Sequence, residues 1–330
     1  MRPLLGLLIL VFAIPTASAG PTDPVRISGA PSFLLEWGTL GTGPGNFITP
    51  SAVATDPLGN VYVVDAENHR IQKFTKNGDF ILEWGSLGSG EAQFSNPNDV
   101  CIGPGGEVYV ADGGNQRVQK FTSSGSYVLE WRADGTGPEE FSGAAAIACD
   151  LAGNVYVADA VANSIFKFSD TGAFISKWGT TGSGPGQLRQ PQGLAIDGAR
   201  GIVYVLDRRN LRISEFSTAG EFLGSWGEPG SGVSQFYAPR QIALSPSGTL
   251  FVVENLLNRI QAFTASGSFL AAFGSQGTEP GDFRSPTDVF VNVAGDIYVS
   301  DALNNRIQKF ASDPTPTNRL SWGRIKSLYR

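Results

Sequence analysis

The chain has 330 residues, with 42 glycines, 11% aromatic residues and only 16% charged residues. So much glycine with so little charge predicts a turn-rich fold, because folded domains usually carry about 7% glycine and about 25% charged residues. The aromatic content excludes a disordered chain, since its burial offsets the entropy of ordering. A net charge of -6 argues against nucleic acid or an anionic membrane as the partner.

The N-terminus has the pattern of a secretory signal peptide. Arg2 precedes an apolar run at residues 4–13, and Ala17-Ser18-Ala19 forms a small-residue cleavage site. The apolar run is half the length of about 20 residues that a membrane-spanning helix needs. We therefore expect residues 1–19 to be removed and the mature chain to have no transmembrane segment. It would then be secreted, periplasmic or held at the cell surface, with residues 20–32 as a linker.

The rest of the chain is a six-fold repeat. Segments such as DAENHRIQKF and DALNNRIQKF recur every 47 or 48 residues. A fixed period of this length is the mark of a repeat architecture. The six segments begin at Asp65, Asp112, Asp159, Asp207, Glu254 and Asp301.

Each repeat predicts four short strands. In the first, residues 52–55, 61–64, 71–74 and 80–84 are rich in Val, Ile, Phe and Tyr, and turns of Gly, Asn and Asp separate them. Four antiparallel strands per 40 to 50 residues are typical of a β-propeller blade. We predict an all-β fold, a six-bladed β-propeller of four-stranded antiparallel blades spanning residues 33–310.

The last blade predicts how the ring closes. It has three strands before a Pro-containing linker and basic tail at residues 311–330, whereas residues 33–38, FLLEWG, copy the outermost strand of the other blades. We expect this N-terminal strand to complete blade six and remove its open edge. The alternative is residues 319–323, which also contain Trp-Gly but follow the prolines.

The units NVYVVDAENHRIQKF and GEVYVADGGNQRVQKF, preceded by a Gly-x-Gly loop and Pro-x-x-aliphatic, resemble NHL repeats. The resemblance implies a propeller but no particular activity, because propellers host many functions.

NHL-like amidating lyases use several metal-ligating histidines, and this chain has only His69. One histidine also excludes a His-based zinc site. The tripartite-motif relatives carry a RING and a coiled coil, which this chain lacks. Similarity to lactonase-type six-bladed propellers leaves a Ca²⁺-dependent hydrolase or lyase open.

Equivalent positions of the six repeats, called columns here, can be compared with one another. Columns that keep one residue type in every repeat are predicted to stabilise the scaffold. Three aromatic columns, which include Phe74, Tyr62 and Trp37, should pack between blades. The acid after the second strand should pair with the Arg five residues later, except in blade three, where Ser164 replaces Arg. Cys101 and Cys149 fall on innermost strands of adjacent blades, and we expect two buried thiols, because sheets packed about 10 Å apart exceed the reach of a disulfide.

Columns that vary are predicted to hold the ligand-binding residues. The two positions after the proline that begins each innermost strand should surround one mouth of the central channel. If the channel held Ca²⁺, oxygen ligands would come from Asp99, Asp288 and Asn98; otherwise no cofactor is expected. The candidate channel-mouth residues are Asn98, Asp99, Gln192, Arg240, Gln241 and Asp288.

A second variable set is basic and lies in the loops of blades four and five. It suggests an arc that attracts an anionic partner, and the approaches to blades two and three, with Glu91, Asp134, Glu139 and Glu140, should be acidic. The arc consists of Arg189, Arg208, Arg209, Arg212 and Tyr237.

Taken together, these features predict an exported, monomeric, non-enzymatic module that binds a protein, peptide or glycan through its loop face. The alternative is the Ca²⁺-dependent hydrolase or lyase.

Overall fold

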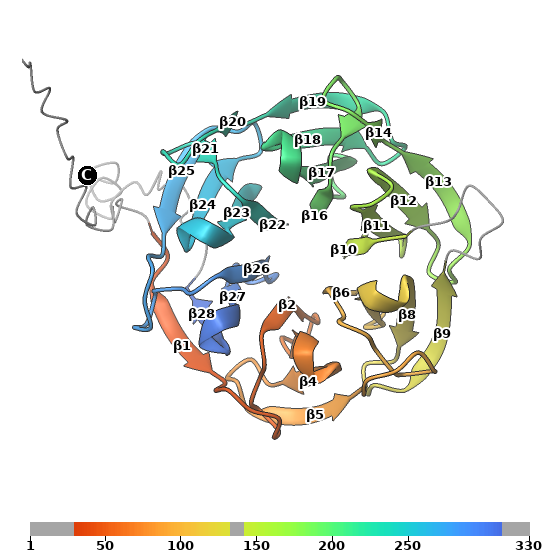
Figure 1. Ribbon diagram of the computed structural model, residues 1–330, viewed down its shortest axis with the longest axis vertical. Helices are drawn as coiled ribbons and strands as arrows, with labels where there is room; N and C mark the ends of the chain where they lie inside the picture. Colours follow the sequence, from red (N-terminus) through yellow and green to blue (C-terminus); the bar gives the residue numbers. More distant parts are fainter. Residues whose placement is uncertain (1–29, 133–141, 312–330) are drawn as a thin grey trace, which may run out of the picture.

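The computed structural model describes residues 30–132 and 142–311, and it is a ring of six four-stranded antiparallel sheets (Figure 1). The predicted signal peptide, most of the linker and the basic tail, and the acidic residues Asp134, Glu139 and Glu140, lie outside the described residues. Within the described part, no helix is long and apolar enough to cross a membrane. The predicted six-bladed, all-β architecture is confirmed.

Blades one to five each run from their innermost to their outermost strand in chain order. Blade one is β2 (Pro50–Thr55), β3 (Val61–Asp65), β4 (Arg70–Phe74) and β5 (Phe80–Trp84). Blade two is β6 (Asp99–Ile102), β7 (Val108–Asp112), β8 (Arg117–Phe121) and β9 (Tyr127–Arg132). Blade three is β10 (Ala144–Cys149), β11 (Val155–Asp159), β12 (Ser164–Phe168) and β13 (Phe174–Trp178).

Blades four and five repeat this order, whereas blade six takes its outermost strand from the N-terminal end of the propeller. Blade four is β16 (Pro191–Asp197), β17 (Ile202–Asp207), β18 (Arg212–Ser217) and β19 (Phe222–Trp226). Blade five is β22 (Pro239–Leu244), β23 (Thr249–Glu254), β24 (Arg259–Thr264) and β25 (Phe269–Phe273). Blade six is β26 (Pro286–Val291), β27 (Ile297–Asp301), β28 (Arg306–Phe310) and β1 (Phe33–Trp37).

Strand β1 closes the ring as predicted. It pairs antiparallel with β28, with Phe33 opposite Phe310 and Trp37 opposite Ile307. The Arg306 guanidinium donates to the Glu36 carboxylate at 2.8 Å, which ties the two strands together by charge as well. The first and last strands of the propeller therefore share one sheet.

Short connections join the strands at the two ends of the blades. Three-residue 3-10 turns follow the second strand in every blade except blade three: η1 (Ala66–Asn68), η2 (Gly113–Asn115), η3 (Arg208–Asn210), η4 (Asn255–Leu257) and η5 (Ala302–Asn304). The loop to the next blade is held by short parallel pairing, as between β14 (Thr180–Thr181) and β15 (Gln187–Leu188), or β20 (Glu228–Pro229) and β21 (Gln235–Phe236). These turns and loops share one face of the ring, called here the η-turn face.

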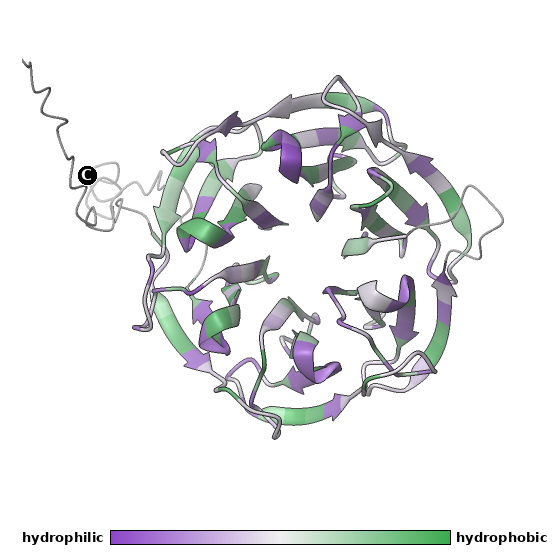
Figure 2. Cartoon of the chain, viewed as in Figure 1, coloured by the Kyte–Doolittle hydropathy of each residue, from purple (hydrophilic) through white to green (hydrophobic). Residues whose placement is uncertain are grey.

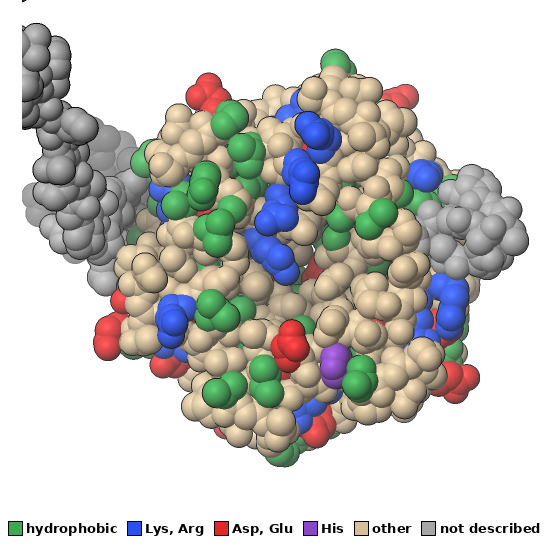
Figure 3. Space-filling model, in the orientation of Figure 1, with side chains coloured by type: hydrophobic (Ala, Val, Ile, Leu, Met, Phe, Trp, Pro, Cys, Tyr) green, Lys and Arg blue, Asp and Glu red, His purple; other side chains and the backbone are tan. Residues whose placement is uncertain are grey.

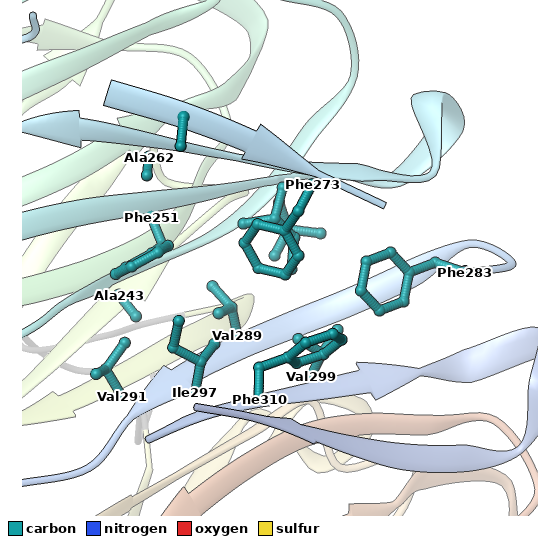
Figure 4. Close-up of a cluster of buried hydrophobic side chains, with 13 residues drawn as sticks. Ala243, Phe251, Ala262, Phe273, Phe283, Val289, Val291, Ile297, Val299 and Phe310 are labelled. Atoms are coloured by element: carbon teal, nitrogen blue, oxygen red, sulfur yellow. The ribbon is translucent and has the colours of Figure 1, made fainter. Parts of the chain in front are cut away.

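The hydrophobic core lies between blades. Strand β3 is buried along its whole length because both faces of its sheet are covered, whereas the outer strand β1 alternates between half-buried and exposed residues. At every junction the aromatic residue near the end of an outer strand packs on the Phe of the next blade, with ring centroids 5.1 to 6.3 Å apart. Between blades five and six, Phe273, Phe283 and Phe310 point toward one another (Figure 4). The predicted inter-blade role of the aromatic columns is confirmed.

The repeated acid–Arg pair anchors the loop between blades. Arg70 pairs with Asp65 at 2.8 Å and also donates to the carbonyls of Thr42, Gly43 and Asn46 in the preceding loop. Arg117, Arg212, Arg259 and Arg306 form the same pair in their own blades. These five arginines hold the scaffold.

Asp159 of blade three, which lacks the Arg, finds other donors. Its side chain is fully buried, and its oxygens accept hydrogen bonds from the backbone amides of Ser142, Val161 and Ala162 at 2.6 to 2.8 Å. Backbone donors thus replace the guanidinium, so this carboxylate is not available to a ligand.

The expectation of two free thiols is wrong. Cys101 of β6 and Cys149 of β10 form a disulfide, with their Cα atoms 6.0 Å apart. The 10 Å spacing used in the prediction describes sheets packed face to face. Innermost strands of neighbouring blades converge toward the ring axis, which brings their Cα atoms within disulfide reach.

Candidate ligand-binding face

The polar ring at the channel mouth first serves to join neighbouring blades. Asn98 donates to the Ala144 carbonyl of the next blade at 2.8 Å, and Ser51 and Thr287 at equivalent positions make the same kind of bond to Pro97 and Pro50. Side chains at this position are therefore held against the neighbouring innermost strand. Gln192 differs, because its buried Oε1 atom has no hydrogen-bond partner within the described ranges.

Asp99 and Asp288 lie deeper in the channel and are also tied to the next blade. Asp99 accepts hydrogen bonds from the amides of Val100 and Ile147, at 2.8 and 2.9 Å. Asp288 accepts the equivalent bonds from Val289 and Val53, both at 2.8 Å. Each carboxylate thus fastens one innermost strand to its neighbour.

Gln241 bridges the channel. Its Nε2 atom donates to Asp99 Oδ2 at 3.1 Å, and this bond joins blade five to blade two, which stand on opposite sides of the ring (Figure 1). Its Oε1 atom accepts from the Ile242 amide at 3.0 Å, which fixes the orientation of the amide group. A polar layer therefore crosses the channel below its mouth.

The electrostatics of this layer are set by burial. Desolvation raises the pKa of Asp99 to about 7, although hydrogen bonds from Ile147, Val100 and Gln241 act in the opposite direction. Burial likewise raises the pKa of Asp288 well above its ordinary value, and the charge of Asp99 raises it further. Arg240 lies close enough to both carboxyl groups to favour their ionised forms.

These residues do not form the oxygen cage that Ca²⁺ needs, which is six to eight ligands. Both oxygens of Asp99 and of Asp288 already accept backbone amides, and Gln241 presents an amide N–H toward Asp99. In the part of the chain that the structure describes, no three His, Cys, Asp or Glu side chains are grouped to hold a metal.

The basic arc lies on the η-turn face, over blade four. Arg208 and Arg209 sit on η3, the first half-buried and the second exposed, and Arg189 is exposed on the loop before β16. In the other blades the positions of Arg208 and Arg209 carry Ala, Gly, Asn, Glu, Val or Leu. The η3 turn is accordingly hydrophilic, whereas η4 with its two leucines is hydrophobic (Figure 2).

The arc and the channel mouth are continuous. Burial lowers the pKa of Arg240, and the nearby charge of Arg208 lowers it further. Figure 3 shows Lys and Arg side chains in a row that runs over blade four to the centre of the ring. We call Arg189, Arg208, Arg209 and Arg240 the arginine row.

A pocket of about 370 Å³ lies beside the arginine row, between blades three and four. Arg209 is held over it by a hydrogen bond from its Nε atom to Gln190 Oε1 at 2.7 Å. Asn163 fixes the other wall, since it accepts from the Gln190 amide at 2.7 Å and donates to the Thr181 hydroxyl at 3.0 Å. The pocket is lined by Ala160, Val161, Asn163, Thr181, Arg189, Gln190 and Arg209.

Two of the residues predicted for the arc are placed differently from the rest. Arg212 belongs to the scaffold, because it pairs with Asp207 at 2.9 Å and donates to three loop carbonyls. Tyr237 is 51% exposed on the blade-five side of the row. The sequence analysis did not identify Gln190, Asn163 and Thr181 as site residues. They stand in loops and turns, and only variation among the six repeats could have pointed to them.

Comparison with known proteins supports the fold. The family model for the NHL repeat matches residues 47–74, 94–121 and 283–310, and a model described as a 6-bladed beta-propeller matches residues 146–230. No curated protein sequence matches the chain.

Several solved structures share the architecture at low identity. A gluconolactonase from Xanthomonas campestris is 12% identical, with 88% of this chain and 96% of that chain covered and a TM-score of 0.62. An auxiliary nutrient binding protein from Bacteroides thetaiotaomicron is 14% identical, covering 80% and 69%, with a TM-score of 0.60. A catalytically inactive virginiamycin B lyase from Staphylococcus aureus, with quinupristin, is 15% identical, covering 88% and 98%, with a TM-score of 0.57. At these identities the likeness concerns the fold alone. The chain is a six-bladed β-propeller that contains NHL repeats.

Proposed function

We propose that this propeller is a binding module that captures an acidic segment of a partner protein or peptide on its η-turn face. The arginine row carries the proposal: three arginines of blade four and one of blade five lie side by side, with Arg189 and Arg209 exposed. Charge that the scaffold does not use is available to a ligand, and Arg suits carboxylates because its guanidinium binds both oxygens at once.

The surroundings of the row favour a polypeptide over a glycan. Tyr237, Leu256 and Val161 are 51%, 61% and 67% exposed on turns and loops of the neighbouring blades. An apolar flank beside arginine is typical of protein interfaces, where Tyr and Arg are enriched. A glycan platform would call for more than one exposed aromatic side chain, and Tyr237 alone is exposed beside the described row.

The enzymatic alternative rests on the fold, which lyases and a gluconolactonase share. Fold alone does not assign an activity. The channel carboxylates are committed to backbone amides, so they offer that alternative little support.

We also infer that the protein is exported. The Cys101–Cys149 disulfide supports this, because such bonds persist in oxidising compartments, and the sequence of residues 1–19 has the pattern of a signal peptide.

The binding proposal is tested with a fluorescent peptide of alternating Glu and Leu, followed by anisotropy at low and high salt. We expect saturable binding that salt weakens, and a loss of at least ten-fold in affinity in Arg208→Glu/Arg209→Glu. A Lys–Leu peptide should not bind. The matched control is Lys76→Glu/Arg132→Glu, which reverses two charges away from the row and should keep wild-type affinity.

Equal affinity of the wild type and the Arg208→Glu/Arg209→Glu variant would overturn the proposal. Tighter binding of a sulfated oligosaccharide than of the Glu–Leu peptide would assign the row to glycans instead.

A further inference from the structure

Four blades share a lysine ammonium at the seam with the next blade, at the ends of the strands opposite the η-turn face. In blade one, Lys73 Nζ lies 4.9 Å from the centre of the Tyr62 ring and donates to the Ser123 carbonyl of blade two at 2.9 Å. Such a position combines a cation–π contact with a carbonyl acceptor. The same two contacts are made by Lys120, Lys167 and Lys309, with ring distances of 5.1 to 5.2 Å and carbonyl distances of 2.8 to 3.5 Å.

Blade four has a carboxylate where these blades have the ammonium. Glu215 stands opposite Tyr204 in the strand register, as Lys73 stands opposite Tyr62. Its Oε1 atom accepts a hydrogen bond from Trp226 Nε1 at 2.9 Å, whereas the indole nitrogens of Trp37, Trp84, Trp131 and Trp178 have no partner in the described ranges.

Glu215 has no cation of its own. It is half-buried, and among residues 30–132 and 142–311 no Lys, Arg or His forms an ion pair with it. Burial raises the pKa of Glu215, and the hydrogen bond from Trp226 acts in the opposite direction. Partial burial of a carboxylate without a counter-ion lowers the stability of the fold, and a cation that binds beside the carboxylate recovers part of that stability.

A pocket opens at the same seam. Its volume is about 450 Å³. Glu215 and Tyr204 are not part of its lining, which consists of Arg200 of blade four and of Ser247, Gly248, Thr249, Thr264, Ala265, Ser266 and Leu270 of blade five. Ala265 is the counterpart of Ser123, whose carbonyl accepts the lysine of blade one. Leu270 adds an apolar side to the pocket.

Arg200 also lines the pocket, but its charge is compensated. Its Nε atom lies 3.6 Å from Asp197 Oδ2. Burial raises the pKa of Tyr204 and the nearby charge of Glu215 raises it further, whereas the hydrogen bond that Arg200 donates to the Tyr204 hydroxyl acts in the opposite direction. Glu215 remains the uncompensated charge at this seam.

We propose that the seam between blades four and five binds a primary alkylammonium group, whose nitrogen takes the place that lysine Nζ fills in four other blades. The ammonium neutralises Glu215, lies over the Tyr204 ring and donates to the turn at Ala265, while its alkyl chain contacts Leu270. The site is on the face opposite the arginine row, so it stands or falls independently of the proposed function.

Calorimetric titration with butylammonium tests the site, with 1-butanol as the neutral probe of equal length. We expect butylammonium to bind and 1-butanol not to bind. Glu215→Gln should weaken binding at least ten-fold. Glu215→Lys should abolish it and raise the Tm, because the new lysine fills the position as it does in blade one. The matched control, Glu221→Gln, removes an exposed charge at the end of the turn between β18 and β19 of blade four and should bind as the wild type does.

A free amine and a lysine side chain present the same group. A second titration with a blocked Gly-Lys-Gly peptide separates them: tighter binding of butylammonium assigns the site to small amines, and tighter binding of the peptide assigns it to a lysine of another protein. The proposal is overturned if neither probe binds, if 1-butanol binds as well as butylammonium, or if Glu215→Gln leaves affinity unchanged.

Discussion

Single arginines on one face of this propeller have two different uses. The Arg117 side chain is 1% exposed and bonds Asp112, Glu130 and three loop carbonyls, so its charge is consumed by the fold. Arg209 is exposed and makes one side-chain hydrogen bond, to Gln190. Comparison among the six repeats separates these uses, because Arg117 stands in a repeated column and Arg209 in a variable one. Arg212 was predicted for the basic arc because it lies near the loops of blade four. It stands in a repeated column, and its charge is used by the scaffold.

The carboxyl group of Asp99 gives the first prediction, on pH dependence. Because burial raises its pKa from 3.8 to about 7, the folded protein keeps a proton that the unfolded chain releases between about pH 4 and pH 7. Its contribution to stability is therefore fully present below about pH 4 and is lost as the pH rises to about 7. Urea unfolding across this range should show a smaller loss of unfolding free energy in Asp99→Asn than in the wild type.

The control for this titration is Glu67→Gln, at an exposed residue of η1. It should reproduce the wild-type pH dependence. If Asp99→Asn and the wild type lose the same free energy between pH 4 and pH 7, the Asp99 carboxyl is ionised in the folded protein throughout and the polar layer is less buried than described.

At the scale of strands, the sequence predicted pairing within a blade better than contacts between innermost strands. Runs rich in Val, Ile, Phe and Tyr between turn residues locate β2 to β5, but they carry no information on how closely β6 and β10 approach at the axis. That distance depends on the radius of the closed ring, which is why the disulfide was missed. The bond between Gln241 and Asp99 was missed for the same reason, since it joins blades 142 residues apart in sequence.

The disulfide between β6 and β10 gives the second prediction. It closes a loop of 48 residues, and restricting a loop of this length in the unfolded chain stabilises the fold by about 4 kcal/mol in the chain-entropy model. Cys101→Ser/Cys149→Ser should therefore lower the free energy of unfolding by about 2 to 4 kcal/mol. Urea unfolding of the wild type in reductant should give the same loss, while reductant should not affect the double variant. Equal stability of the wild type and the double variant in oxidising buffer would contradict the role of this bond.

At the scale of the whole molecule, the six-fold repeat made the fold predictable from the sequence. The functional sites were harder to predict. Six agreeing units determine the blade, and the incomplete sixth unit predicts closure by residues 33–38. The sites depend on departures from the repeat. Four of those departures form the arginine row, whose residues come from the loop before β16, from η3 and from β22 and lie together in the folded ring. Glu215 is a departure that the sequence already displays, as the one acid in a column that is otherwise Lys or Ala.

Closure by β1 gives the last prediction, because a ring and an open array respond differently to damage at the N-terminus. Trp37 of β1 packs on Phe74 of blade one at 5.8 Å and on Tyr298 of blade six at 6.4 Å, so it joins the two ends of the propeller. Trp131 makes the equivalent contacts with Phe168 and Tyr109 inside the ring.

Since every blade of a closed ring has two neighbours, Trp37→Ala and Trp131→Ala should each lower the global unfolding free energy by about 3 to 5 kcal/mol. Urea unfolding measures this cost, and amide hydrogen exchange in β28 shows whether the edge opens alone. If Trp37→Ala speeds exchange in β28 but leaves the global midpoint unchanged, the N-terminal strand frays without opening the ring, and closure does not contribute to stability as the β1–β28 pairing implies.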